Sequence, residues 1–315
     1  MNTTKLVDFG SVIKKAWQYT WKYKYLWFLG ILTGGGFSGG GNNINYLINS
    51  GSENQNWQNI FHNHAVSSSP IMGKILGATD YSISTGFIVF MSLLGLILAI
   101  ALIYLQITAR GAIITAVDKL DQNQHFTLGN SWHAGHKYFW RIFLFTLLLV
   151  FIILVPLAFL FTPVAIMASL RWYIPAVIVG IIFALIFVVY AIYIALIVQF
   201  GERILVLEDK GPWQSIIIGE KFFRKNWKNV LLTYLINMAV AMLAGIVVVI
   251  ACLIVVGLLF GIVYGIYTAN STAAIVVAIP LGLAVLIALM IIGGIISAYQ
   301  SSILTLAYKE IKNIA

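Results

Sequence analysis

The sequence predicts an all-α polytopic membrane protein with six transmembrane helices, arranged as three repeats of an interfacial helix followed by a helical hairpin. Composition is the first observation, since 61% of the 315 residues are hydrophobic and only 9% are charged, far from the balance of a soluble domain. Long runs without any charged residue are the second, and they are typical of helices that cross hydrocarbon. The third is a pattern that occurs three times along the chain.

Each copy of the pattern has a basic, aromatic and amphipathic stretch, then an apolar run, then a second apolar run with a glutamine near its end. The stretches cover residues 11–25, 127–141 and 215–228, and the glutamines are Gln106, Gln199 and Gln300. The pattern predicts a single membrane domain over 1–315, with repeats at about 6–117, 118–205 and 206–315. We expect the first amphipathic stretch to continue into its span without a break.

Six apolar runs predict the six spans. They cover 25–33, 87–108, 142–161, 174–198, 230–268 and 273–302, and the first is short but continues an aromatic helix. If the run 230–268 were two spans, Lys309 and Lys312 would lie on the outer side, and no polar turn marks such a break. Residues 34–85 are expected to form a flexible polar extracytoplasmic loop, which opens with a glycine-rich tract.

The basic residues predict the orientation. With the amino terminus inside, all of the 19 Lys and Arg except Lys74 and Arg171 fall on the cytoplasmic side, as expected because basic loops are retained during insertion. The sequence therefore predicts a multi-pass protein of the inner (plasma) membrane with both termini cytoplasmic.

The net charge of +9 is then concentrated at one membrane face. Each basic cluster adjoins a span and alternates with Trp and Tyr, which favours anionic lipid headgroups over nucleic acid as the partner. Ordinary topology signalling is the alternative interpretation. The candidate anionic-lipid contacts are Lys14, Lys15, Trp17, Trp21, Lys22, Trp132, Lys137, Trp140, Arg141, Lys221, Arg224, Lys225, Trp227 and Lys228.

Polar residues at the inner ends of the spans form the second candidate site. Arg110 and Arg203 follow the first two glutamines by one helical turn, whereas Leu304 follows the third. Polar groups within spans often mark ligand or ion paths, but they can also simply satisfy one another between helices. The candidates for a polar cavity around the pseudo-axis, or for interhelical contacts, are Gln106, Arg110, Gln199, Glu202, Arg203 and Gln300.

Three smaller features add local expectations. Glu220 lies on the apolar side of its stretch with Arg224 at i+4, which predicts a local ion pair, with contact to a substrate cation as the alternative. Prolines at 156, 163 and 175 predict kinks in the third and fourth spans. Glycines at 257, 261 and 265 permit close backbone approach, either within the chain or at a homodimer seam.

A resemblance adds to these observations. Leu207-Glu208, the Gly211-Pro212 turn and the basic-aromatic stretch that ends at Trp227 resemble a recurring segment of a bacterial membrane family. Residues 25–30, Tyr-Leu-Trp-Phe-Leu-Gly, are similar to the opening of related proteins. The family comprises the membrane domain fused to some glycerophosphoryl diester phosphodiesterases, with many uncharacterised stand-alone relatives. Barely a dozen residues follow Ile303, so we expect no phosphodiesterase domain, and the resemblance assigns no catalytic residue.

The sequence predicts no strand–turn–helix nucleophile elbow, no paired-carboxylate site and no zinc-protease helix. We therefore expect no enzymatic activity, no cofactor and no metal site. The favoured hypothesis is a non-enzymatic role in organising or handling lipids, or in supporting partner membrane proteins. The alternative is a small-molecule or lipid transporter or channel with a polar pathway between the hairpins, and an enzyme that acts on lipid comes third. Membrane lipids, mainly anionic, are the expected partners, with homo-oligomers and other membrane proteins left open.

Overall fold

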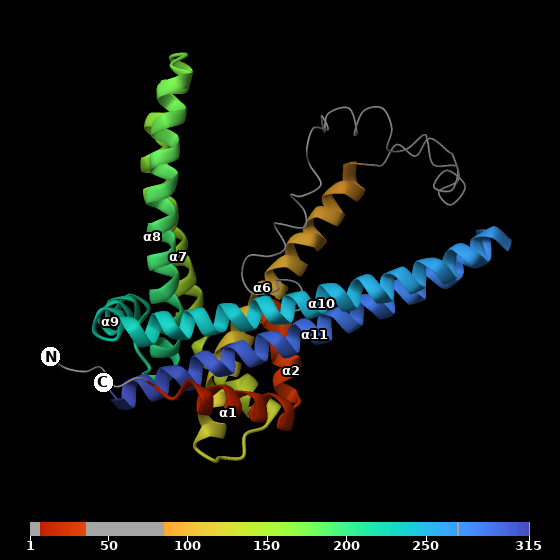
Figure 1. Cartoon of the computed structure of the whole chain (residues 1–315), viewed down its shortest axis with the longest axis horizontal. Helices are drawn as coiled ribbons and strands as arrows, with labels where there is room; N and C mark the ends of the chain where they lie inside the picture. The colour runs from red at the N-terminus through yellow and green to blue at the C-terminus, as the bar shows by residue number, and fades with distance from the viewer. Residues whose placement is uncertain (1–6, 36–84, 270, 315) are drawn as a thin grey trace. The chain divides into compact units, whose positions relative to one another are not determined.

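The computed structural model describes residues 7–35, 85–269 and 271–314, and all regular elements in these ranges are helices (Figure 1). The chain divides into two compact units, Met1–Phe37 with Leu105–Ala315, and Ser38–Tyr104; the contacts below belong to the first. Nearly all of the predicted loop over 34–85 lies outside the described residues. The elements are α1 Phe9–Lys22, α2 Tyr25–Gly30, η1 Ile31–Gly35, α6 Thr85–Asp121, α7 Leu128–Ser169, α8 Tyr173–Leu207, α9 Pro212–Lys225, α10 Trp227–Ala269 and α11 Ser271–Ile314.

Five helices are long and apolar enough to cross a membrane. They cover Val89–Asp121, Leu128–Ser169, Tyr173–Leu207, Trp227–Thr268 and Val276–Ile314, and each exceeds the roughly 20 residues that hydrocarbon requires. The chain is therefore a multi-pass helical membrane protein. The predicted first span corresponds to a shorter apolar helix, Tyr25–Gly34, so the arrangement with six spans stays a prediction.

The outward faces of these helices are apolar. Phe159 of α7, Ile174 of α8 and Leu253 of α10 are among many large apolar side chains that the chain leaves exposed. In water such continuous exposure would be costly, whereas lipid tails are as apolar as these side chains. The exposed apolar surface is thus consistent with hydrocarbon around the spans.

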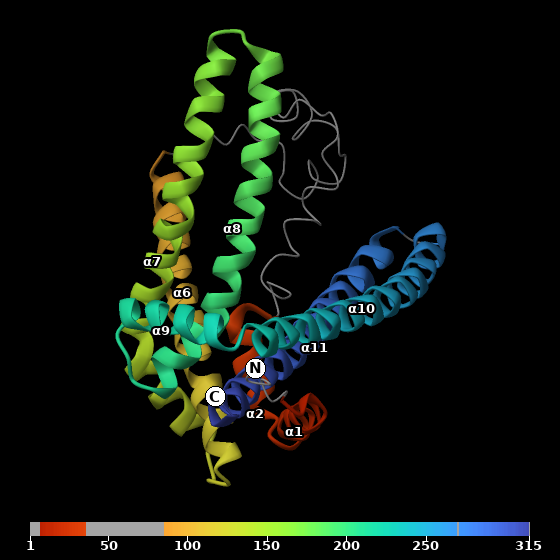
Figure 2. The same ribbon diagram turned by 60° about the vertical axis from the view of Figure 1, so that its left-hand side comes forward.

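Two pairs of consecutive helices lie side by side, α7 with α8 and α10 with α11 (Figure 2). The α7–α8 turn passes through Arg171, which has a φ of 63°. Pro156 and Pro163 lie inside α7, as predicted, but Pro175 is the third residue of α8. The prediction that Pro175 interrupts a span was wrong, because the first turn of a helix has no backbone hydrogen bond for proline to remove.

The amphipathic stretches differ in how they join their spans. The expectation that the first copy continues without a break was wrong, since α1 ends at Lys22 and α2 begins at Tyr25. Trp27 Nε1 donates to the carbonyl oxygen of Thr20 at 2.7 Å, so a side chain satisfies a carbonyl at the end of α1. The second copy instead forms the first turns of α7, and the third, α9, ends before Asn226.

The buried core lies at the carboxyl ends of α6, α8 and α11, where the short helices pack. One cluster joins Val12 and Ala16 of α1 to Phe200, Ile303 and Ala307, and a second joins Leu26, Ile113, Phe145 and Leu205.

Close backbone contact holds α7 against α6. A Cβ atom at Gly135 would overlap the carbonyl oxygen of Thr108, so glycine is required there. By contrast, a Cβ atom at each of the glycines 257, 261 and 265 would lie in open space, more than 4 Å from its neighbours. These three glycines therefore make no close helix contact within the described part of the chain.

Candidate functional site

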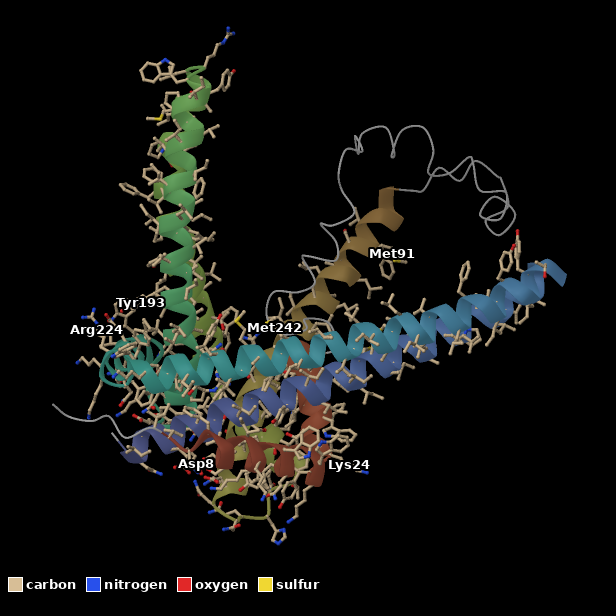
Figure 3. The ribbon with its side chains drawn as sticks, in the orientation of Figure 1. Asp8, Lys24, Met91, Tyr193, Arg224 and Met242 are labelled. Atoms are coloured by element: carbon tan, nitrogen blue, oxygen red, sulfur yellow. The ribbon has the colours of Figure 1, made fainter. Side chains whose placement is uncertain are left out.

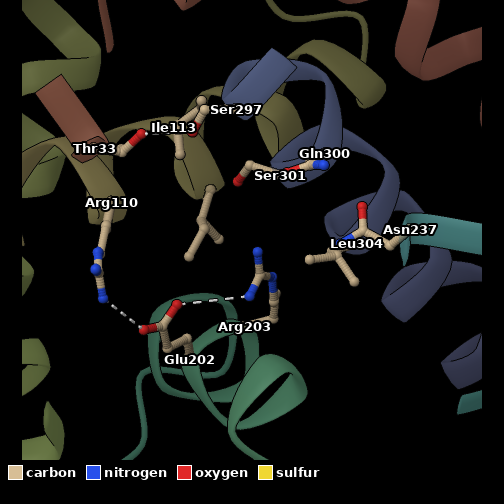
Figure 4. A pocket seen from close by; sticks show the side chains of 11 residues that line it. Thr33, Arg110, Ile113, Glu202, Arg203, Asn237, Ser297, Gln300, Ser301 and Leu304 are labelled. Carbon is tan, nitrogen blue, oxygen red and sulfur yellow. Dashed lines mark hydrogen bonds and ion pairs between the residues drawn. The ribbon is translucent and has the colours of Figure 1, made fainter. Parts of the chain in front are cut away.

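A polar pocket of about 160 Å³ lies where η1, α6, α8, α10 and α11 meet (Figure 4). Its apolar lining comes from Ile113, Ile114 and Leu304. The remaining lining residues are polar or charged, and they are Thr33, Arg110, Glu202, Arg203, Asn237, Ser297, Gln300 and Ser301. A pocket of this polarity among apolar helices is unusual and is a default candidate for ligand binding.

Glu202 lies between two guanidinium groups in this pocket. Its carboxylate oxygens are 3.5 Å from Arg110 Nη1 and 3.6 Å from Arg203 Nη1, beyond the 2.7–2.9 Å of a strong charge-assisted hydrogen bond. With two guanidinium groups and one carboxylate, the formal charge of the group is +1. The side chain of Arg203 is only 7% exposed, whereas that of Arg110 is 37% exposed, so the guanidinium of Arg203 is the one that is shielded from water.

Arg203 is incompletely satisfied. Its Nη1 donates to the backbone oxygen of Gln199 at 2.6 Å, but its buried Nε has no hydrogen-bond partner among the described residues. The buried Oδ1 of Asn237 also has none there. A buried unsatisfied polar group is costly. The unpaired Nε of Arg203 can donate to an anionic acceptor, whereas Oδ1 of Asn237 can only accept a hydrogen bond.

Four of the six residues predicted for a polar cavity line this pocket, namely Arg110, Glu202, Arg203 and Gln300. The three glutamines do not all line it. Gln106 Nε2 donates to the backbone oxygen of Thr33 at 3.3 Å, and the buried Oε1 of Gln199 has no hydrogen-bond partner in the described part of the chain. The charged members of the prediction thus come together, whereas the glutamines have separate surroundings.

The remaining polar lining residues were missed from the sequence. Asn237 was visible as a polar residue within the apolar run 230–268, and Ser297 and Ser301 lie on the same face of α11, one turn apart. Thr33 and Ser297 are joined by a hydrogen bond of 2.8 Å between their hydroxyls. That contact joins η1 to α11, and no sequence spacing could have predicted it.

A second polar region, which we name the charged cluster, lies in the middle of α1 and near the ends of α6 and α11. It consists of Lys15, Asp118, Asp121, Lys309 and Glu310. Lys309 Nζ lies 2.9 Å from Asp118 and 2.7 Å from Asp121, and Lys15 lies 3.9 Å from both Asp121 and Glu310. Nearby, burial raises the pKa of Tyr19, and the negative charge of Asp121, to which Tyr19 donates a hydrogen bond, raises it further. The cluster thus links α1, α6 and α11.

Glu208, just after α8, makes a further link to α11. Its Oε1 accepts hydrogen bonds from Tyr308 at 2.5 Å and Lys312 at 2.7 Å. Burial alone would raise the pKa of Glu208, but these hydrogen bonds and the charges of Lys312 and Lys210 hold that pKa below its ordinary value of 4.5. Glu208 is therefore ionised at neutral pH.

Three of the predicted lipid-contact residues form ion pairs within the chain. Arg141 pairs with Asp209 at 2.5 Å, and Lys15 belongs to the charged cluster. Arg224 pairs with Glu220 at 2.6 Å, which confirms the predicted local ion pair. Tyr193 of α8 lies beside this pair (Figure 3) and donates to Glu220 at 3.2 Å.

The other candidate lipid contacts are mostly exposed. Trp17, Trp21, Trp140 and Trp227 all present at least 45% of their surface, while Trp132 packs against the second core cluster. A lysine ammonium lies over an aromatic ring in each amphipathic stretch. The pairs are Lys22 over Tyr23, Lys137 over Tyr138 and Lys228 over Trp227, at 5.5, 5.3 and 5.7 Å from the ring centroids.

The apolar helices and the polar pocket between them define a multi-pass helical membrane protein. The chain belongs to the family described as Family of unknown function (DUF7544), whose model matches residues 19–306. No curated protein and no solved structure matches the chain. Membership of an uncharacterised family agrees with part of the resemblance drawn from the sequence. The match shows no link to glycerophosphoryl diester phosphodiesterases, so that part stays a prediction.

Proposed function

We propose that this chain is a non-enzymatic, multi-pass protein of the plasma membrane that holds anionic lipids against the basic, aromatic faces of α1, the start of α7, and α9. A surplus of exposed cations carries the proposal. Each of the eight acidic side chains in the described ranges has a hydrogen-bond or ion-pair partner within the chain. The exposed lysines Lys14, Lys22, Lys137, Lys221 and Lys228 therefore have little carboxylate left to pair with.

The surroundings of these lysines suit a headgroup layer. Trp and Tyr rings favour the membrane interface, and a lysine on the same face extends its ammonium group toward the phosphates. Each basic residue near an anionic surface contributes about 1 kcal/mol. Five such residues on four helices, α1, α7, α9 and α10, would favour anionic over zwitterionic lipid around the protein.

We further propose the arrangement of six spans in three repeats, with both termini cytoplasmic. A recurrent packing contact supports the repeats. Gly135 of α7 lies against Thr108 of α6, and Gly219 of α9 lies against Gly201 of α8. Thr108 and Gly201 each follow a repeat glutamine by two residues.

The third instance of this contact involves α1 and α11. Val12 and Ala16 of α1 share a core cluster with Ile303 and Ala307 of α11, and Ser302, two residues after Gln300, is buried there. Each amphipathic stretch therefore packs against the helix that ends the neighbouring repeat. Labelling of single cysteines at each terminus tests the orientation, and reactivity of the two termini from opposite membrane sides would contradict it.

Lipid analysis tests the proposed function. The full chain is extracted gently from its membrane, and the lipids that remain are measured by mass spectrometry. In a variant with Lys14, Lys22, Lys137, Lys221 and Lys228 changed to Gln, we expect the ratio of anionic to zwitterionic lipid to fall severalfold, because the headgroup attraction is lost. Arg171→Gln is the matched control, because Arg171 lies in the turn between α7 and α8, at the ends of these helices that are far from the amphipathic stretches. An unchanged ratio in the fivefold variant would contradict the proposal.

A further inference from the structure

We propose that the polar pocket binds the phosphate of one phospholipid, whose acyl chain lies in an apolar groove between α10 and α11. The inference rests on the proposed function only in that the protein handles anionic lipid. It concerns a separate site, the polar pocket, and does not involve the five exposed lysines of the proposed function.

The charge and unmet hydrogen bonding of the pocket favour a phosphate. Arg110 and Arg203 carry two positive charges against the single charge of Glu202, at contacts of 3.5 and 3.6 Å. Arg203 is buried, and its Nε has no hydrogen-bond partner in the described ranges. Guanidinium groups present a planar set of donors that match phosphate oxygens. A phosphate that contacts both arginines would supply the missing acceptor and would offset the positive charge of the group.

The apolar groove lies further along two of the helices that form the pocket. It has a volume of about 290 Å³, and Val248, Cys252 and Val255 of α10 and Leu281, Val285 and Ile292 of α11 are among its lining residues. Its lining is almost entirely apolar. It therefore suits a hydrocarbon chain and has no hydrogen-bonding groups for a polar headgroup.

The spacing of the two sites fits one lipid molecule. Along α11 the groove residue Ile292 precedes the pocket residue Gln300 by eight positions, and along α10 Val248 follows Asn237 by eleven. At a rise of 1.5 Å per residue the near end of the groove lies about 12 and 17 Å from these pocket residues, close to the roughly 15 Å hydrocarbon depth of one leaflet. Its far end, at Leu281 and Leu259, lies about 28 and 33 Å from them. A phosphate in the pocket and a chain directed toward the bilayer centre would therefore reach the near end of the groove.

This geometry distinguishes a phospholipid from simpler occupants. A free phosphate would fill the pocket and leave the groove unused. An apolar helix of another membrane protein would cover the groove but offer nothing to Arg110 and Arg203. A phospholipid satisfies both sites with one molecule, and these three occupants give different results in the experiment below.

Cys252 provides the probe, because it is the single cysteine of the chain and lines the groove. The full chain is placed in nanodiscs of phosphatidylcholine, with or without phosphatidylglycerol, and two quantities are measured. One is the number of lipids retained by native mass spectrometry after release into detergent. The other is the rate at which a neutral maleimide modifies Cys252. We expect phosphatidylglycerol to leave one retained lipid and to slow the modification of Cys252 about fivefold or more, in proportion to its occupancy.

Variants assign the site. Arg110→Gln with Arg203→Gln should lose both the retained lipid and the protection of Cys252. Glu202→Gln should retain the lipid more tightly, because it removes the competing carboxylate, and it keeps the test decisive if the arginine variant does not fold. The variant with five neutral lysines should still retain the one lipid, which separates failure of this inference from failure of the proposed function.

Three outcomes would overturn the inference. The first is that phosphatidylcholine alone slows the modification of Cys252 as much as phosphatidylglycerol does. The second is that the arginines bind inorganic phosphate, in a separate measurement with phosphate alone, while lipid does not change the rate at which Cys252 is modified. The third is a Glu202→Gln variant that folds and retains no more anionic lipid than the unmodified chain.

Discussion

The charged cluster and the polar pocket both bring acids and bases together from distant parts of the chain, yet their charge balance differs. In the cluster, Lys309 lies within 3 Å of Asp118 and of Asp121, and two lysines face three carboxylates. In the pocket, two arginines face one carboxylate, and neither contact is shorter than 3.5 Å.

The difference separates a structural site from a candidate binding site. In the cluster the chain supplies close partners for its own charges, so a ligand would have to displace a well-made ion pair. In the pocket, the buried Nε of Arg203 has no hydrogen-bond partner among the described residues. A site that binds an anion needs such an unpaired donor, because any hydrogen bond or ion pair already made within the protein would have to be broken on binding.

The largest expected effect comes from removing the central cation of the cluster. Lys309→Met leaves Asp118 and Asp121, both mostly buried, without their close partner. We expect the free energy of unfolding, measured in SDS, to fall by about 3 kcal/mol. Lys24→Met is the control, since the described residues show no ion pair for Lys24, and it should leave stability nearly unchanged. Retention of anionic lipid per folded molecule should not change in either variant.

A smaller effect on stability is expected in the pocket. In Arg203→Met, Glu202 keeps Arg110 as its partner at 3.5 Å, so the unfolding free energy should fall by about 1 kcal/mol or less. Retention of the one lipid that the pocket holds should be lost. If Arg203→Met destabilised the protein as much as Lys309→Met, the pocket would be a second structural cluster and the comparison would fail.

Acid should weaken the link between α8 and α11. The pKa of Glu208 is lowered in the folded protein, so the stabilisation is fully present above pH 4.5 and is lost as pH falls below that value through the folded pKa. Unfolding followed from pH 7 to about 3 should show this loss. Glu208→Gln should be less stable at pH 7 and show a shallower acid dependence. An identical pH profile for the two proteins would contradict the assignment.

The smallest effect concerns one hydrogen bond. Tyr308→Phe removes the donor to Glu208 and should cost about 1 kcal/mol of unfolding free energy. Tyr264→Phe, on an exposed ring that stacks on Phe260, is the matched control with little expected change. Because Tyr308 and Glu208 share one contact, the double variant should lose less than the sum of the two single losses.

These two regions also show what the sequence could predict. The membrane class followed from apolar runs, and Arg110 and Arg203 attracted notice because each follows a glutamine at the inner end of a span by one helical turn. The run 230–268 was expected to form one span rather than two, and it lies within the single helix α10. In each case the information is local, in the composition and period of a single segment.

The missed features depend on contacts between distant segments. The equivalent positions of the glutamines in the three repeats suggested that they meet, but the rotation of each helix about its axis is set by packing, and Gln106 instead bonds to Thr33. The break after α1 is accompanied by a side-chain hydrogen bond, from the indole of Trp27 to Thr20, that no periodicity reveals. The charged cluster joins Asp118 to Lys309, and no periodicity within either helix reveals that partner.

An electron cryomicroscopy structure in nanodiscs with phosphatidylglycerol tests the central claim, that the pocket is an anion site left open by the chain, most directly. The account predicts phosphate-sized density in contact with Arg110 and Arg203, continuous with chain density between α10 and α11. A pocket without such density, in a map that resolves ordered lipids elsewhere on the protein, would contradict it.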